Sequence, residues 1–276
     1  MIRPIKAIVI RNLMKFVRDK MRLFFTLLMS GLFLFIFSFA TKSIGIALPH
    51  PMNYLISGMI IMTVFQTSLN NSMSILEDIS SGFMKEILVA PIARWQIATG
   101  QIVSSTIVST LQGMIIIIIG IFIGLEIDLL HGVLMIALML LVGLTFSSLG
   151  LFLASITKDS TNFQLLITLI ALPLTFLSGA YIPTMALPKM ITPIVYLNPL
   201  TYTTSAFRFV ALHMEHQPVS ELVASGVAFD INGFIVTPAI DIVLIIAMGM
   251  LFFTLCVRKF SNADFSRVKV FRGGHR

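Results

Sequence analysis

The sequence predicts an all-α integral membrane protein with six transmembrane helices, and three observations lead to this fold class. First, 57% of the 276 residues are hydrophobic and 11% are charged, whereas soluble domains carry about 25% charged residues. Second, apolar stretches of about 20 residues, the length that spans a bilayer as a helix, recur along the chain. No segment shows the alternating pattern of an outer-membrane barrel. Third, the net charge of +7 comes mainly from a cluster of basic residues at each end, which favours a membrane anchor over a nucleic-acid partner.

The apolar stretches give approximate boundaries for the spans of one transmembrane domain, 1–276. Residues 1–22 carry apolar and basic side chains on opposite faces, which predicts an amphipathic helix lying in the membrane interface. The segment 178–238 contains more than half of the 11 prolines and is too mixed for a span. We expect it to form outer re-entrant helices, at about 190–197 and 207–213. The six spans are expected at about 23–41, 53–75, 102–125, 132–156, 163–177 and 239–257.

Charge sets the expected orientation. The basic start followed by an apolar run resembles a signal peptide, but the run is long for one, so we expect an uncleaved first span. With six spans, both termini lie on the cytoplasmic side. All of the 19 lysines and arginines then lie inside except Lys42, Lys189 and Arg208, as the positive-inside rule requires.

Residues 77–101 form a charged segment between two spans. The sequence Ser80-Ser81-Gly82 is expected to end one helix, and residues 83–89 can form a short helix that presents Phe83, Ile87 and Leu88. A short apolar helix with flanking charges suits docking into a groove on another protein. A plain surface loop is the alternative.

Two spans carry polar faces. Thr63, Gln66 and Asn70 recur at helical spacing in the second span, and Ser105 and Ser109 lie in the third. In a bilayer such faces turn toward protein or toward a water-filled path. Packing between helices and a substrate path therefore both remain open.

Several kinds of chemistry are missing. No G-x-x-x-x-G-K-[ST] motif occurs, so the chain has no Walker A loop to hold nucleotide phosphates. No G-x-S-x-G motif occurs either. His213 and His216 lack an evident third ligand, so no metal site is expected. Asp241 is the only acid or base within the spans, which disfavours an ion-coupled carrier or a membrane enzyme. Cys256 is the single cysteine, which excludes an internal disulfide.

Two segments together resemble the type-2 ATP-binding-cassette export permeases. Residues 178–208 are similar to the C-terminal motif of that family, and residues 77–101 to its cytoplasmic segment. The Arg–Glu pair common before the glycine of that segment is replaced here by Asp78-Ile79-Ser80. The matching residues are Ser178-Gly179, Pro183, Pro188, Asn198-Pro199-Leu200-Thr201-Tyr202 and Arg208, then Glu77-Asp78, Gly82, Ile87-Leu88, Pro91 and Arg94.

The resemblance implies a half-transporter without enzymatic activity or a bound cofactor. Two copies, identical or different, would form the path, and a separate ATPase subunit would bind ATP and Mg²⁺. Coupling to the ATPase would involve Glu77, Asp78, Gly82, Phe83, Ile87, Leu88, Pro91 and Arg94. Substrate-path candidates are Thr63, Gln66, Asn70, Ser105, Ser109, Tyr181, Asn198, Tyr202 and Arg208; the last four could instead satisfy backbone groups in a broken helix.

Within the family, the basic N-terminal helix that runs directly into the first span resembles the drug-resistance branch. That branch exports amphipathic or lipophilic molecules, such as drugs or lipids, across the plasma membrane of prokaryotes. Export of a lipid-linked glycan or polysaccharide is the alternative within the family, because the polar faces of the second and third spans could serve it equally well. The expected partners are the ATPase, a second permease copy and membrane lipids, with no nucleic acid.

Overall fold

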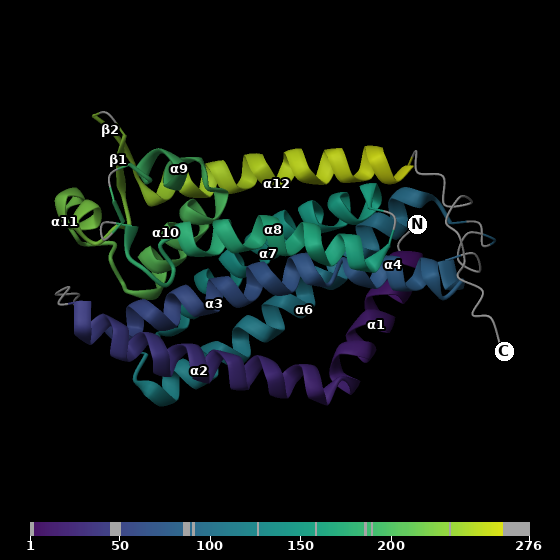
Figure 1. The fold of residues 1–276 in the computed structure, drawn as a ribbon, viewed down its shortest axis with the longest axis horizontal. Helices are drawn as coiled ribbons and strands as arrows, with labels where there is room; N and C mark the ends of the chain where they lie inside the picture. The colour runs from purple at the N-terminus through teal and green to yellow at the C-terminus, as the bar shows by residue number, and fades with distance from the viewer. Residues whose placement is uncertain are drawn as a thin grey trace.

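The computed structural model describes residues 3–44, 51–84, 89, 92–125, 127–157, 159–184, 187–188, 190–231 and 233–261. Within this part of the chain, long helices run along the longest axis of the molecule (Figure 1). The only sheet among the described residues is a two-stranded hairpin, so the predicted all-α membrane fold class is confirmed. The long helices are α2 (Lys20–Ile44), α3 (Pro51–Asn70), α6 (Arg94–Ile123), α7 (Leu129–Ile156), α8 (Ser160–Leu177) and α12 (Pro238–Ser261).

Five apolar helical stretches in the described residues are long enough to cross a membrane. In chain order they overlap the predicted second to sixth spans. The first predicted span falls on α2, whose described apolar stretch is the shorter Leu23–Phe33, so the total of six spans stays a prediction. The five stretches are Met52–Ser80, Arg94–Ile123, Leu129–Ile156, Ser160–Leu177 and Pro238–Phe260.

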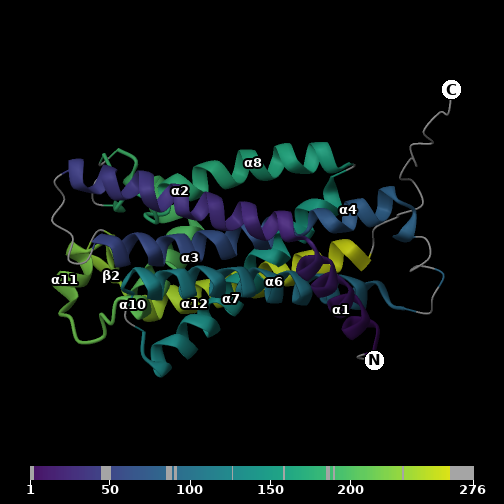
Figure 2. The same ribbon diagram turned by 90° about the horizontal axis from the view of Figure 1, so that it is seen from below.

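Helix α3 forms the centre of the bundle. Of its most apolar window, 78% is buried, compared with 17% for α8, which therefore lies at the periphery. Phe65 of α3 meets Phe146 of α7 edge to face, with ring centroids 4.6 Å apart. Figure 2 shows α2 and α8 lying along one side of α3. This arrangement leaves one face of α3 covered only by peripheral helices.

Glycines allow α3 and its neighbours to approach closely. A Cβ on Gly150 of α7 would lie 2.9 Å from the carbonyl oxygen of Leu69, and one on Gly58 of α3 would overlap the backbone of Ala180. Small residues at such contacts let helix backbones pack tightly in a bilayer, where dispersion contacts drive association.

The two ends of the bundle differ in structure. One end, called here the α4 end, carries α1 (Arg3–Arg18), α4 (Met73–Ser80) and the start of α6. The other, the hairpin end, carries the short elements of the predicted re-entrant region. These are α9 (Thr192–Leu197), α10 (Pro199–Ala211), α11 (Val219–Ala224), β1 (Phe229–Ile231) and β2 (Phe234–Val236).

Local capping explains where these short elements begin. Asn198 accepts a hydrogen bond from the Leu200 N–H at 2.9 Å, and Pro199 follows at the first helical position, so α10 starts well before the predicted residue 207. Strands β1 and β2 pair antiparallel with Phe229 opposite Val236. Gly233, with φ of 87°, permits the turn between them.

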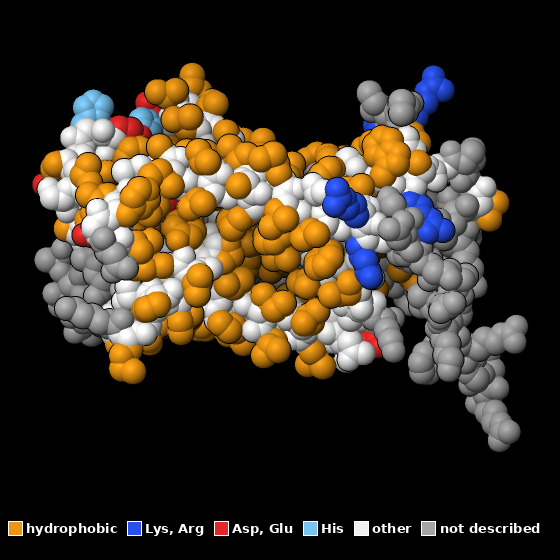
Figure 3. Space-filling view, turned by 90° about the horizontal axis from the view of Figure 1, so that it is seen from above, with side chains coloured by type: hydrophobic (Ala, Val, Ile, Leu, Met, Phe, Trp, Pro, Cys, Tyr) orange, Lys and Arg blue, Asp and Glu red, His pale blue; other side chains and the backbone are white. Residues whose placement is uncertain are grey.

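The surface separates into an apolar band and two different ends. In Figure 3 hydrophobic side chains cover the middle of the molecule, Lys and Arg side chains gather toward one end, and His side chains lie at the other. On α8 the exposed apolar residues Leu165, Leu169 and Leu172 follow helical spacing. An apolar band of this kind suits contact with lipid or with another membrane helix.

Candidate functional site

A cavity of about 500 Å³ with both polar and apolar walls lies against α3, between that helix, α2 and α6. Its wall includes Thr63, Gln66 and Asn70, three residues that the sequence assigned to a substrate path, together with Tyr181 after α8. The polar face of α3 thus turns toward open space. Other polar residues in the wall are Thr26, Thr67, Asn71, Ser74, Glu77 and Gln112.

The same cavity also has apolar walls that can adapt their shape. Methionine is unbranched and polarisable, so it fits ligands of different outline. A wall that mixes such side chains with amides and hydroxyls suits an amphipathic molecule. The apolar residues are Phe25, Met29, Phe33, Met59, Met62 and Met73.

A second cavity of about 290 Å³ lies between α3 and α8 and shares part of this wall. Phe33, Gln66, Asn70 and Tyr181 line both cavities. The rings of Phe33 and Tyr181 stack with centroids 5.4 Å apart and an angle of 15° between their planes. Burial raises the pKa of Tyr181 to about 12, so its hydroxyl is neutral near pH 7. The stacked pair therefore forms an uncharged partition between the two cavities.

Hydrogen bonds join the helices around the larger cavity. Thr67 of α3 donates to Gln112 of α6 at 2.5 Å, and the Gln112 amide donates to Thr26 of α2 at 2.9 Å. Such bonds hold membrane helices in register. The peripheral helix α2 is therefore tied to the centre of the bundle at the level of the cavity.

Ser105 and Ser109, the two path residues predicted in the third span, do not line this cavity. Ser105 faces a separate cavity of about 220 Å³ beside α1. Ser109 is fully buried and donates to the carbonyl of Thr106 in its own helix at 2.9 Å. A serine in a membrane helix often satisfies its hydroxyl in this way.

Three other predicted path residues lie toward the hairpin end and bind backbone carbonyls. Arg208, 1% exposed, donates through Nη2 to Gly179 and Ala180 at 3.2 and 3.3 Å. Asn198 donates to the carbonyl of Leu174 at 2.8 Å. Tyr202 donates to the carbonyl of Tyr196 at 2.5 Å. These bonds satisfy broken-helix carbonyls, which was one of the two open alternatives; a role in the path stays a prediction.

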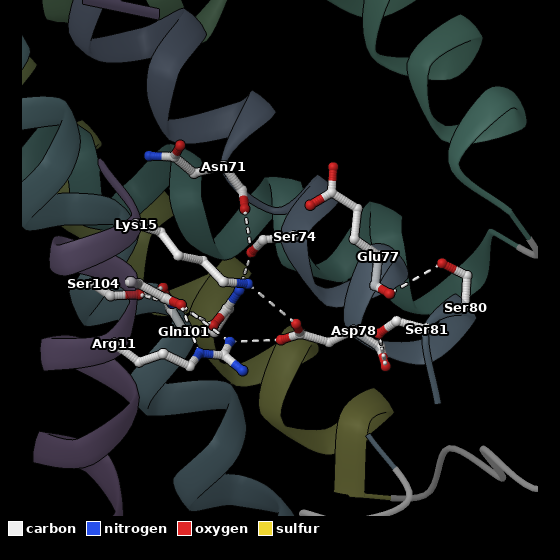
Figure 4. A network of polar contacts seen from close by, with 11 residues as sticks. Arg11, Lys15, Asn71, Ser74, Glu77, Asp78, Ser80, Ser81, Gln101 and Ser104 are labelled. Carbon is white, nitrogen blue, oxygen red and sulfur yellow. Dashed lines mark hydrogen bonds and ion pairs between the residues drawn. The ribbon is translucent and has the colours of Figure 1, made fainter. Parts of the chain in front are cut away.

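At the α4 end, an ion pair joins α1 to the predicted coupling segment. Asp78, which is buried, lies 2.5 Å from Arg11 and 3.4 Å from Lys15. Figure 4 shows both cations reaching toward the Asp78 carboxylate from α1. The guanidinium of Arg11 also lies 4.9 Å from the centre of the Phe83 ring, in the range of a cation–π contact. The basic face of α1 therefore binds α4 through ion pairs and packs against Phe83 just after it.

Amides extend this contact to α6 and to the break between α3 and α4. Asn12 of α1 donates to Gln101 at 2.8 Å and to Ser104 at 2.7 Å. The Gln101 amide in turn donates to Ser74, whose hydroxyl donates to the carbonyl of Asn71 at 2.8 Å. Asn71 and Ser74 also line the larger cavity. A continuous set of polar contacts thus runs from α1 to the cavity wall.

Four other predicted coupling residues, Glu77, Gly82, Phe83 and Arg94, fall within the described part of the chain. Gly82 has a φ of 81°, which is compatible with the predicted break after Ser80. Phe83 and Glu77 are exposed, and Arg94 begins α6. Ile87, Leu88 and Pro91 fall outside the described residues.

Sequence reasoning missed the contribution of Arg11, Asn12 and Lys15. Arg11 and Lys15 lie one turn apart on the basic face of the predicted amphipathic helix. That spacing was the available signal for a contact with an acidic residue elsewhere in the chain.

Comparison with known proteins gives the family. Residues 3–212 match the ABC-2 type transporter family. A protein named as the transport permease ycf38 of Cyanophora paradoxa is 27% identical over 202 residues, which cover 72% of this chain and 67% of that protein. The Escherichia coli K12 protein named as a multidrug ABC transporter permease, YbhR, is 25% identical over 55% of this chain and 41% of its own length.

A third relative is the inner membrane transport permease YadH of Escherichia coli K12, which is 26% identical over 61% of this chain and 66% of its own length. The aligned part thus spans between two fifths and two thirds of these relatives. The family match covers well over half of the chain and includes α1, the coupling segment and α10. The chain therefore belongs to the ABC-2 type transporter family of membrane transport subunits.

Proposed function

We propose that this chain is the membrane subunit of an ATP-driven exporter that moves an amphipathic or lipophilic molecule out of the cell. The observation that carries the proposal is the cavity of about 500 Å³, whose wall combines Gln66 and Asn70 with methionines and phenylalanines. A relative named as a multidrug ABC transporter permease supports the substrate class. ATP and Mg²⁺ are bound by a separate ATPase subunit, since the chain has no phosphate-binding loop.

In this proposal the α4 end faces the cytoplasm of a prokaryotic cell and both termini lie on that side. The basic residues of α1 and those at the end of α12, Arg258 and Lys259, support this orientation. The hairpin end then faces outward and covers the outer end of the path.

The segment after α4 is proposed to dock into a groove of the ATPase. Phe83 is 36% and Val89 88% exposed, although both are apolar. Burying such side chains in a partner's groove is favourable. Movement of this segment reaches α1 through Asp78 and reaches the cavity wall through Ser74 and Asn71.

A second copy of the permease is proposed to complete the path. The cavities beside α3 are bounded by the peripheral helices α2 and α8, and α8 presents exposed Leu165, Leu169 and Leu172. A second copy that packs on this side encloses the polar residues of α3 away from lipid, which is favourable for amides in a bilayer.

A co-purification experiment tests the coupling part of the proposal. Phe83→Asp is expected to abolish co-purification of the ATPase while the permease still inserts in the membrane. Phe234→Asp is a matched control, because Phe234 is an exposed aromatic on β2 at the opposite end. Normal recovery of the ATPase with Phe83→Asp, or equal loss in both variants, contradicts the proposal.

Export of a lipid-linked glycan is the second candidate, favoured by the amides of Gln66 and Asn70 and by the hydroxyl of Thr63 on one face. Stimulation of ATPase activity in reconstituted vesicles separates the two. We expect lipophilic cations or drugs to stimulate the complex, with Gln66→Leu changing which compounds do so. Stimulation by a lipid-linked glycan alone favours the second candidate.

A further inference from the structure

Four ionisable side chains from two distant parts of the chain meet at the hairpin end. Asp128 caps the start of α7, and His131 lies in the first turn of that helix. His213 and Glu215 lie in the turn that follows α10. One ligand atom from each of Asp128, His131 and His213 lies within 4.8 Å of the others. The ring centroids of the two histidines are 3.7 Å apart.

The contacts of His131 orient its two ring nitrogens differently. Its Nδ1 lies beside Asp128 Oδ1, and its Nε2 lies 2.9 Å from Glu215 Oε1. Metal-binding histidines commonly donate their second ring N–H to a carboxylate, which fixes the ring and its tautomer. Glu215 stands in that position, so Nδ1, which lies beside Asp128 Oδ1, is the nitrogen left to bind a metal.

Backbone geometry also places these side chains. The His131 N–H donates to Asp128 Oδ1 at 3.0 Å. This bond holds the Asp128 carboxylate beside the imidazole of His131. His213 is the only non-glycine residue with a positive φ in the described part of the chain, at 53°. Such conformations are uncommon and concentrate at binding sites.

We propose that Asp128, His131 and His213 bind a first-row transition-metal dication such as Zn²⁺, with Glu215 orienting His131. Two imidazoles and one carboxylate suit Zn²⁺ better than Mg²⁺ or Ca²⁺, which prefer oxygen ligands. Zinc bonds of about 2.0–2.2 Å draw three ligand atoms to within roughly 3.5 Å of one another. Small side-chain rotations of exposed or half-buried groups supply that contraction.

The site fastens the start of α7 to the segment between α10 and α11. In the proposed orientation it lies on the outer surface, where external metal can reach it. Three protein ligands leave a fourth position for water or for another ligand. The site shares no residue with the cavity or with the ATPase contact, so the metal-site proposal can be tested independently of the proposed transport function.

Zinc titration of the full-length chain, purified in detergent with a tag that contains no histidine, tests the proposal. We expect one Zn²⁺ per chain, with affinity reduced more than about 100-fold in His131→Gln and in His213→Gln. Glu215→Gln is expected to lose roughly 10-fold, because it removes only the orienting contact. His216→Gln is the matched control, since His216 lies in the same turn but outside the cluster.

Cobalt provides a second measurement on the unaltered chain. Co²⁺ bound in place of Zn²⁺ should give the visible absorption of nitrogen and oxygen ligation, and that absorption should be lost in Asp128→Asn, which is expected to keep the helix cap. The proposal is overturned if the unaltered chain binds no more Zn²⁺ than the His131→Gln/His213→Gln double variant. Equal weakening by His216→Gln and His213→Gln also overturns it.

Discussion

Arg11 of α1 and Asp78 of α4 form an ion pair with an Nη2–Oδ2 distance of 2.5 Å, although 67 positions separate them in the chain. The Asp78 side chain is 6% exposed, whereas that of Arg11 is 24% exposed. Because the acid is buried, loss of its cationic partner is costly: the carboxylate would stay in the interior without a compensating charge. This ion pair therefore stabilises the packing of the amphipathic helix against the coupling segment.

Asp78→Asn is expected to destabilise the permease by about 1–3 kcal/mol, because Arg11 and Lys15 lose their shared anion. Thermal unfolding in detergent measures the change. The control is Glu77→Gln, which alters the neighbouring exposed carboxylate and is expected to have little effect.

A double-mutant cycle with Arg11→Gln checks that the effect comes from the pair. The two substitutions together should cost about 0.5–3 kcal/mol less than the sum of the single changes, as expected for groups in contact. Additive effects would show that the two side chains act independently.

The sequence was sufficient for features that depend on neighbouring residues. Span length and hydropathy are local properties, so the apolar stretches predicted the long helices well. Gly82 was identified as a break because glycine adopts a positive φ without strain. The polar spacing of Thr63, Gln66 and Asn70 likewise predicted a shared face, which the structure turns toward a cavity.

Contacts between distant segments could not be predicted in this way. The pairing of Arg11 with Asp78 depends on how α1 crosses α6. His213 looked as if it lacked a third ligand, because Asp128 and His131 reach it only when the start of α7 lies beside the end of α10. The three-residue strands β1 and β2 are too short to give a periodic signal.

Gly150→Ala is expected to destabilise the protein by about 1–3 kcal/mol, because the added methyl group meets the backbone of Leu69. A backbone neighbour cannot rotate away as a flexible side chain can. Gly31→Ala in α2 is the matched control, because nothing lies within 4 Å of the position that its methyl group would take. Alanine there should leave stability unchanged or raise it by up to about 1 kcal/mol. Equal melting temperatures for the two variants would contradict close packing of α7 on α3.

Arg208→Lys is expected to cost about 2–4 kcal/mol of stability, although the charge is kept. The guanidinium carbon lies 3.4 Å from the Tyr54 ring centre, and Nη2 donates hydrogen bonds to two backbone carbonyls. A lysine ammonium lacks the planar fork that makes these contacts together. Arg18→Lys on the exposed end of α1 serves as the control and should be neutral. If Arg208→Lys keeps full stability but loses transport, the residue acts in the path instead.

The stacked pair Phe33 and Tyr181 offers a test of the cavity itself, on the basis of the proposed function. Aromatic pairs contribute about 0.5–1.5 kcal/mol beyond their buried area. A ring that stacks on the substrate contributes a similar amount to binding, so Tyr181→Ala and Phe33→Ala should each raise the substrate concentration for half-maximal ATPase stimulation by roughly 3- to 10-fold. Tyr181→Phe keeps the ring and should stay within about twofold of the unaltered protein.

The comparison between the two Tyr181 variants separates stacking from hydrogen bonding. A loss in Tyr181→Phe as large as that in Tyr181→Ala would assign the effect to the hydroxyl group. No change in either variant, with the complex still assembled, would mean that substrate does not pass between Phe33 and Tyr181. Because both residues line the two cavities, that result would exclude the partition between them as part of the path.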